Sequence, residues 1–379
     1  LWISDQRIGK SKEIYMEENR WLFFVILTII AIYAIGQKTK LNKKRCIQAV
    51  TVILTCFSGF RSYQMGDVFH YAYAYQTCTS PGWTLDLGSN DTVGLQLLFY
   101  GAGKIGLNFQ ACLFIIAAFV AITLGLLIYK YSPSPFWSYA MYLGMGFYIA
   151  SFNILKQIIA MGFIVLALMC ILENKPIRFV LLVVIASLFH LPSVIFLVAY
   201  PFAKKKIDTM FFVIIAITIV LVFSFRDQIV EQASTLYYEG DMTFENTETI
   251  GGRVIMMAII LILGLVMRPI REYDKIYSQI FNIMVLAVIV QTFSVYNNVF
   301  SRLADYFYQF VVVFIPLMLQ PGWEQAEQYP EHVNEIRCYD KKLYQMIYIP
   351  ILIFTIVYYF TYINTSSALL SDFRFFWRT

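Results

Sequence analysis

Long runs of apolar residues, separated by short polar and charged connections, dominate the pattern of this chain. A helix crosses the hydrocarbon core of a bilayer with about 20 mostly apolar residues. That length predicts spanning helices near residues 20–36, 46–61, 107–130, 135–151, 157–173, 209–226, 253–268, 278–296, 303–320 and 343–363. The pattern therefore predicts an all-α fold, a polytopic transmembrane bundle of about 10 spanning helices.

One apolar run, residues 177–203, does not fit a single spanning helix. It contains His190 and Pro192, and basic residues flank it on both sides. Both flanks can face the cytoplasm only if the chain enters the membrane and returns. Each arm has about 13 residues and a length near 20 Å, short of the roughly 30 Å hydrocarbon core. We therefore expect a helical hairpin here, broken at residues 190–192 and with its tip in the outer half of the membrane, in preference to one long tilted helix with a proline kink.

The composition agrees with a membrane protein. Of 379 residues, 59% are hydrophobic and 14% are charged, and the mean hydropathy is +0.64. Soluble proteins carry about 25% charged residues, so a cytosolic enzyme, a nucleic-acid binder and a disordered scaffold are excluded. A transmembrane barrel, with its short alternating strands, is excluded as well. We expect a single integral membrane domain over residues 1–379, without a cleavable signal peptide.

Basic residues give the orientation of the spans, because cytoplasmic loops are enriched in Lys and Arg. The connection after the first predicted span holds a dense basic cluster: Lys38, Lys40, Lys43, Lys44 and Arg45. With that connection in the cytoplasm, alternation makes residues 62–106 and 227–252 outer-face loops and residues 321–342 a cytoplasmic loop. The C-terminus is then outside, and we expect residues 91–104, which are weakly amphipathic, either to lie along the outer surface or to dip into it.

Polar and ionisable residues that border apolar spans are costly and are candidates for function. In the predicted topology they all fall on the outer face: Arg61, Asp67, His70, Asn153, Lys156, Gln157, His190, Arg253, Arg302 and Asp305. Each also has a structural explanation, since an Arg at a span end can extend to the lipid headgroups and a buried His can simply be hydrogen-bonded. Their common side favours a functional site there.

The residue types indicate phosphate chemistry without a metal. Arg and Lys hold phosphate oxygens through charge-assisted hydrogen bonds, and a carboxylate or imidazole can take a proton from a hydroxyl group. Asp67 and His190 are the two candidates for that base, and the sequence does not choose between them. The chain has only three His and none of the common metal-binding or nucleotide-binding motifs, so no metal and no cofactor is expected.

Four segments, in order along the chain, resemble motifs of a known family. They are residues 60–67 followed by Tyr71, residues 153–157, residues 186–190 with Ser193, and residues 300–303 with Tyr306 and Phe307. Together they resemble the signature of the EpsG family, which is grouped with Wzy-type polysaccharide polymerases. Lys156 stands where that family usually has Arg, and Gly66 and Asp67 lack the usual intervening residue.

The resemblance implies polymerisation of lipid-linked oligosaccharide repeats in exopolysaccharide or capsule synthesis. The site would face outward from the bacterial plasma (inner) membrane, in a multi-pass protein of GT-C-like architecture. Undecaprenyl-diphosphate oligosaccharides would be donor and acceptor, with membrane lipid and a chain-length regulator as further partners and no nucleic acid. The predicted catalytic residues are Asp67 and His190. The predicted diphosphate-binding and substrate-binding residues are Arg61, Asn153, Lys156, Gln157, Arg253, Arg302, Asp305 and Tyr71.

Three other functions compete with this one. An O-antigen-type ligase would share the chemistry and differ only in its acceptor, so product analysis distinguishes the two. A membrane O-acyltransferase that decorates the polymer would place His190 beside a cytoplasmic entrance for the acyl donor. A flippase or transporter of the lipid-linked unit would line a cavity at the midplane with charges and would show internal repeats. The outward clustering and the absence of repeats favour the polymerase.

Overall fold

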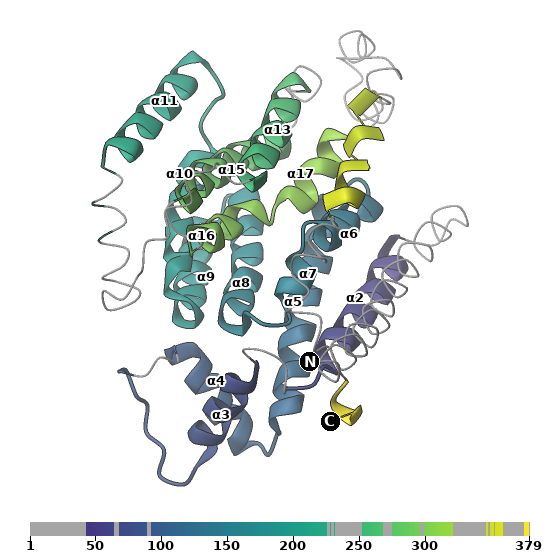
Figure 1. Cartoon of the computed structure of the whole chain (residues 1–379), viewed down its shortest axis with the longest axis vertical. Helices are drawn as coiled ribbons and strands as arrows, with labels where there is room; N and C mark the ends of the chain where they lie inside the picture. Colours follow the sequence, from purple (N-terminus) through teal and green to yellow (C-terminus); the bar gives the residue numbers. More distant parts are fainter. Residues whose placement is uncertain are drawn as a thin grey trace, which may run out of the picture.

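The chain folds into helices throughout the part that the structure, a computed structural model, describes (Figure 1). That part comprises residues 43–63, 68–88, 92–225, 228, 231, 252–267, 275–295, 299–320, 346–347, 349–351, 353–358 and 375–378. Three helices are long and apolar enough to cross a membrane: α5 (Phe109–Tyr131), α8 (Leu155–Leu172) and α15 (Lys275–Thr292). They coincide with three of the predicted spans and agree with a helical membrane protein, whereas the span at residues 20–36 lies outside the described residues.

The helices α2 (Lys43–Gly59), α5 and α8 run side by side (Figure 1). The α5 helix begins where Asn108 caps its first turn by accepting a hydrogen bond from the Ala111 backbone N–H at 2.9 Å. The rings of Phe119 and Phe163 meet at 4.8 Å and join α5 to α8. In a lipid bilayer, close van der Waals packing of such side chains, rather than their removal from water, holds helices together.

The hairpin predicted for residues 177–203 is present. Its first arm is α9 (Pro176–Phe189), and its second arm is η1 (Leu191–Val198) followed by α10 (Ala199–Ala203). The ring of Phe179 lies 5.2 Å from that of Tyr200, whereas one continuous helix would separate them by about 30 Å. The second arm therefore turns back along the first. Its depth in a membrane stays a prediction.

Two predicted spans are each divided into two helices. Residues 135–151 form α6 (Pro135–Gly144) and α7 (Phe147–Ala150), because Gly146 adopts the left-handed conformation with φ of 80°, which ends a helix. Residues 303–320 form α16 (Val299–Tyr308) and α17 (Val311–Met318). Between them Phe310 donates to the carbonyl of Phe307, three residues back, at 3.4 Å, so the chain tightens there. The prediction of continuous spans was wrong at both places.

The predicted outer-face loop, residues 62–106, contains two helices, α3 (Val68–Thr79) and α4 (Val93–Lys104). They pack together at one end of the molecule (Figure 1), and Leu95 and Phe99 of α4 are fully buried. The Thr92 hydroxyl, which precedes α4, donates to the carbonyl of Phe189 at 2.9 Å. A hydrogen bond thus joins the start of the segment 91–104 to the turn of the hairpin.

The remaining described helices pack around α15 and at the edge of the bundle. They are α11 (Thr209–Ser224), α13 (Gly252–Val266), η2 (Phe293–Val295) and η4 (Phe376–Arg378), with a further helical stretch over 349–358. The hydroxyl of Tyr277 donates to the carbonyl of Gly264 at 2.8 Å and joins α15 to the end of α13. At the opposite side of the molecule, the backbone N–H of Phe376 donates to Phe60 at 3.0 Å.

Basic residues gather at one end of the bundle. Lys43 at the start of α2 donates to the carbonyl of Ser132, which follows α5, at 2.8 Å. Lys130 and Lys175 both pair with Glu173 in the turn between α8 and α9 and hold the pKa of that carboxyl well below its usual value. These connections were predicted to share the cytoplasmic side, and the structure confirms that they share one end.

Candidate functional site

His190 lies at the turn of the hairpin, where residues of α8 and α16 approach it. The α9 helix ends there because Pro192, in the first turn of η1, has no backbone N–H with which to continue its hydrogen bonds, and His190 adopts extended angles of −152° and 102°. The imidazole Nδ1 and the hydroxyl of Tyr306 on α16 are 2.6 Å apart and share a hydrogen bond. Lys156 on α8 and Arg302 on α16 are close enough to act electrostatically on this imidazole.

The first turn of α8 contributes Lys156 and Gln157. The amide of Gln157 is buried and donates to the backbone carbonyl of Arg302 at 3.0 Å, which fixes α8 against α16. The ammonium of Lys156 lies 5.9 Å from the centre of the Tyr71 ring on α3, within the range of a cation–π contact. Tyr71 on α3 therefore lies beside Lys156, and its role as a substrate-binding residue stays a prediction.

Arg253 and Asp305 form an ion pair between α13 and α16. The same guanidinium donates to the hydroxyl of Ser301 at 2.7 Å and lies 5.2 Å from the Tyr308 ring. Side-chain exposure is only 24% for the Arg and 15% for the Asp. A pair that is largely removed from water depends strongly on both partners. Because Asp305 is part of α16, the ion pair fixes against α13 the helix that carries Arg302 and Tyr306.

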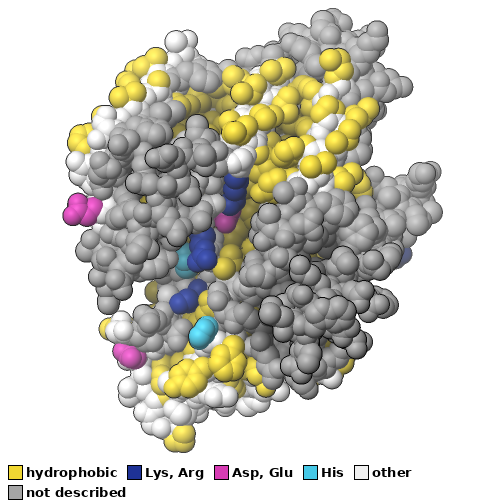
Figure 2. All heavy atoms as spheres, in the orientation of Figure 1, with side chains coloured by type: hydrophobic (Ala, Val, Ile, Leu, Met, Phe, Trp, Pro, Cys, Tyr) yellow, Lys and Arg dark blue, Asp and Glu magenta, His cyan; other side chains and the backbone are white. Residues whose placement is uncertain are grey.

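These contacts link five charged or titratable residues, which we call the polar column: Lys156, His190, Arg253, Arg302 and Asp305. Figure 2 shows basic, acidic and histidine side chains following one another down a hollow in one face of the molecule. Each of the three basic residues stands in the first turn of its helix, and none of those turns contains an acid. Cations at helix N-termini oppose the helix dipole, so this hollow concentrates positive potential.

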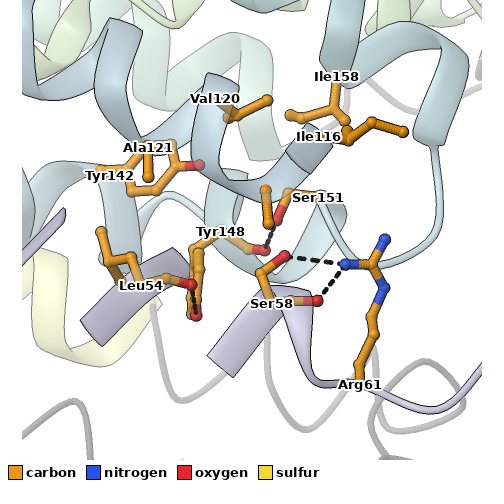
Figure 3. Close-up of a pocket in the computed structure, with 11 residues that line it drawn as sticks. Leu54, Ser58, Arg61, Ile116, Val120, Ala121, Tyr142, Tyr148, Ser151 and Ile158 are labelled. Atoms are coloured by element: carbon orange, nitrogen blue, oxygen red, sulfur yellow. Dashed lines mark hydrogen bonds between the residues drawn. The ribbon is translucent and has the colours of Figure 1, made fainter. Parts of the chain in front are cut away.

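Arg61 lies at the same end but in a separate, closed environment (Figure 3). Its side chain is 1% exposed. Its guanidinium donates to the carbonyl and the hydroxyl of Ser58 in the last turn of α2 and lies 5.9 Å from the centre of the Phe152 ring. Carbonyls in the last turn of a helix lack helical partners, so Arg61 completes the end of α2. The described contacts do not bring it to the polar column.

Two other buried groups lie next to the column in the chain. Asn153, three residues before Lys156, is 5% exposed, and Ser193, three residues after His190, is fully buried. Neither the Asn153 Oδ1 nor the Ser193 Oγ has a hydrogen-bond partner among the described residues. Buried polar atoms are normally paired, so both atoms keep an unused capacity to accept a hydrogen bond.

Comparison with known proteins identifies the family of the chain. The model of the EpsG family matches residues 44–324, about three quarters of the chain. The chain belongs to the EpsG family. Comparison with curated proteins and with solved structures gives no match. As an EpsG protein, the chain is a membrane protein of the polysaccharide-polymerase type.

The segments that resemble the EpsG motifs converge in space. Lys156, His190 and Arg302 come from the second, third and fourth of them, and Tyr71 brings the first to the same place. Asp67, the other candidate base, lies outside the described residues, and His70 is exposed on α3. In the part of the EpsG chain that is described, no group of three or more His, Cys, Asp or Glu could hold a metal ion.

Sequence reasoning missed the residues that position the charged ones. Tyr306 and Ser301 belong to the fourth segment that resembles the family motifs, but the sequence predicted neither of them as a site residue. Gln291 on α15 contacts the Ser301 hydroxyl at 3.2 Å and lies inside an apolar run. A polar residue within a predicted span was the available signal for Gln291.

The contact between α4 and the hairpin gives a first prediction for this EpsG protein. A Cβ at Gly94 would lie 2.9 Å from the backbone of Leu188, whereas a Cβ at Gly101 of the same helix would meet nothing within 4 Å. Gly94→Ala should push α4 away from the hairpin turn and lower both the thermal unfolding midpoint and the length of the polysaccharide made. Gly101→Ala, the matched control, should be neutral or should stabilise by up to about 1 kcal/mol. Equal effects of the two substitutions would contradict this packing.

Proposed function

We propose that the protein polymerises lipid-linked oligosaccharide repeats by glycosyl transfer at the outer face of the bacterial plasma membrane. The observation that carries the proposal is the convergence of Lys156 and Arg302 on His190, whose Nδ1 is bonded to Tyr306. Two cations beside one titratable base suit a reaction in which an anion departs and a hydroxyl loses its proton.

The donor is an oligosaccharide joined through its anomeric carbon to undecaprenyl diphosphate. Lys156 and Arg302 bind the diphosphate oxygens, helped by the positive ends of α8 and α16. This role explains why each helix carries a cation in its first turn, a position that the helix dipole alone would disfavour for a positive charge. As the bond between the anomeric carbon and the diphosphate oxygen breaks, its electron pair leaves with the diphosphate. The two cations stabilise the charge that develops there.

The acceptor is the terminal sugar hydroxyl of a second lipid-linked repeat. Its oxygen forms the new bond to the anomeric carbon, and its proton passes to Nε2 of His190 and then to water. For this step Nδ1 carries the hydrogen and donates to the Tyr306 oxygen, because a neutral imidazole has one donor and one acceptor nitrogen. Asp67 remains the alternative base.

The other residues of the site either fix the positions of the helices or bind sugar. The Arg253–Asp305 pair and the Gln157 amide fix α16 relative to α13 and α8. The free Oδ1 of Asn153 accepts a sugar hydroxyl, and Tyr71 shields Lys156 from the outer side. Arg61 acts as a positioning residue that joins the end of α2 to the segment before α8.

The outward orientation is supported by the distribution of charge. The basic end holds Lys43, Lys130 and Lys175, and such residues favour the cytoplasmic side of spanning helices. Lys156 and Lys175 lie at opposite ends of α8, which is 18 residues long. The length of that helix, about 27 Å, separates the polar column from the basic end by nearly the thickness of the hydrocarbon core.

Matched lysine substitutions in cells that depend on this protein for their polysaccharide test the proposal. Lys104 on α4 also lies over a Tyr ring, at 5.0 Å from Tyr100, but it is exposed and is not part of the column. Lys156→Gln should reduce chain extension by about 10²-fold, as removal of one stabilising donor does in other enzymes, and should leave short products. Lys104→Gln should leave polymer length unchanged. Lys156→Arg should also support chain extension, because arginine keeps the positive charge.

A normal polymer with Lys156→Gln would overturn the assignment of the diphosphate site. The products also separate the polymerase from the ligase. A ladder of repeat numbers indicates polymerisation, whereas transfer of a preformed glycan to one acceptor indicates a ligase.

A further inference from the structure

A pocket lies at the basic end of the molecule, opposite the polar column. Its volume is about 640 Å³, within the range of small-molecule sites. It lies between the end of the hairpin, the start of α11 and the first turns of α15. The lining residues are Asn174, Ala203, Lys204, Lys205, Lys206, Ile207, Asp208, Lys275, Ser278 and Gln279. Four lysines thus face one aspartate.

The backbone that carries the three consecutive lysines is fixed in place. The amide nitrogen of Asn282 on α15 donates to the carbonyls of Phe202, Ala203 and Lys205 at 3.1, 3.2 and 2.8 Å. Asn282 is fully buried. The lysines therefore project from a backbone held against α15, and Lys275 and Gln279 lie one turn apart on that helix. This arrangement is more ordered than a flexible basic loop that serves only to orient the protein.

Within the described part of the chain, the pocket lysines have little acidic counter-charge, and no carboxylate there forms an ion pair with Lys205, Lys206 or Lys275. Lys204 donates to the hydroxyl of Tyr200 at 2.8 Å. The Asp208 carboxylate accepts from the backbone N–H of Phe211 at 2.9 Å and so caps α11. The pocket therefore keeps an excess of positive charge.

Gln279 supplies the second, independent indication of a ligand. Its side chain is 3% exposed and lines the pocket. Neither Nε2 nor Oε1 has a hydrogen-bond partner in the described part of the chain. Leaving a buried amide unpaired costs about 1–3 kcal/mol. A ligand that accepts a hydrogen bond from Nε2 would remove part of that cost.

We propose that this pocket binds the phosphate group of an anionic ligand. The lysines supply the charge, and the Gln279 amide supplies a directed hydrogen bond. Basic pockets between helices near the cytoplasmic surface bind anionic lipid headgroups in other membrane proteins. A membrane lipid suits this position because α11, which begins at the pocket, exposes Met210, Val213 and Ile217. Free phosphate offers the same group without the acyl chains.

Binding to the purified full-length protein in detergent tests the proposal. Three ligands are added separately: phosphatidylglycerol, zwitterionic phosphatidylcholine and inorganic phosphate. Native mass spectrometry counts bound lipid, and the shift of the thermal unfolding midpoint with concentration gives the affinity for each ligand, since a ligand that binds only the folded state raises that midpoint. We expect phosphatidylglycerol to bind and phosphatidylcholine not to bind. Binding of inorganic phosphate as well, or in place of the lipid, would show that the phosphate group alone suffices.

Two double variants with equal loss of charge distinguish the pocket from general basicity. Lys206→Gln with Lys275→Gln removes two pocket lysines, whereas Arg45→Gln with Arg178→Gln removes two exposed cations from α2 and α9, outside the pocket lining. The pocket variant should bind about 30-fold more weakly, since each cation near an anionic lipid contributes about 1 kcal/mol. The control should bind within about twofold of the unmodified protein.

Gln279→Leu should also weaken binding, although it leaves the charge unchanged. Unfolding midpoints measured without ligand verify that all variants fold. The proposal is overturned if neither phosphatidylglycerol nor phosphate binds, or if the two double variants lose affinity equally. Because the readout is binding, it is independent of chain extension at the other end of the molecule.

Discussion

Replacement of His190 with glutamine should lower the rate of chain extension by about 10³-fold, within the range expected for loss of a general base. Glutamine keeps a polar side chain of similar size and can still meet the Tyr306 hydroxyl, but it cannot take a proton. The rate of the unmodified enzyme should fall at low pH, where the imidazole is protonated, and the variant should lack this dependence. Initial rates from purified protein with a lipid-linked repeat give both readouts.

His70→Gln is the matched control. His70 lies at the same end of the molecule, but it is exposed on α3, and its loss should change the rate by less than twofold. Tyr306→Phe should produce a partial loss that appears in kcat rather than KM, because the imidazole then loses the bond that orients it. If His190→Gln keeps the unmodified rate and pH profile, the base is another group, and Asp67 becomes the candidate to test.

Breaking the Arg253–Asp305 pair should have the largest effect on stability. Asp305→Asn leaves the guanidinium of Arg253 largely buried beside a neutral amide, and the loss of one partner from such a pair costs about 3 kcal/mol. The unfolding midpoint should fall, and chain extension should fall with it, because α16 carries Arg302 and Tyr306. Removing the second charge as well, with Arg253→Gln, should recover part of the lost stability.

Glu173→Gln gives the comparison for a pair near the surface. It removes the same charge from the contacts with Lys130 and Lys175, whose side chains are 47% and 44% exposed. Exposed ion pairs contribute at most about 1 kcal/mol, so the midpoint should change little. Equal destabilisation by the two substitutions, measured by thermal unfolding in detergent, would show that the Arg253–Asp305 pair is no more important than a surface pair.

The sequence predicted most of the helices because apolar length and loop charge are local properties. It placed α5 and α8 within two residues of their ends, and charge on both flanks of residues 177–203 was enough to predict the hairpin. It did not predict the break at Gly146, since glycine is common inside membrane helices and only the left-handed angle shows that a helix ends there. It also missed α3, whose apolar residues are too few for a span.

The candidate site was predictable in its residues but not in its pairings. Lys156, His190 and Arg302 were selected because charge bordering a span is costly, and the structure brings them together. Arg61 fitted the same rule, yet it is enclosed beside Ser58 and Phe152. A helix end can meet either a cavity or a neighbouring helix, and only tertiary packing decides which. The bond between Tyr306 and His190 joins residues 116 apart in sequence, so no local pattern could reveal it.

Reconstitution tests the central claim most directly. Purified protein in liposomes, supplied only with an intact undecaprenyl-diphosphate-linked repeat, should produce a ladder of longer lipid-linked chains and release undecaprenyl diphosphate. One diphosphate should be released for each repeat added, because each transfer breaks one bond to diphosphate. The His190→Gln and Lys156→Gln proteins should produce neither. Absence of a ladder from the folded, unmodified protein, or a ladder of unchanged length from both variants, would contradict glycosyl transfer at this site.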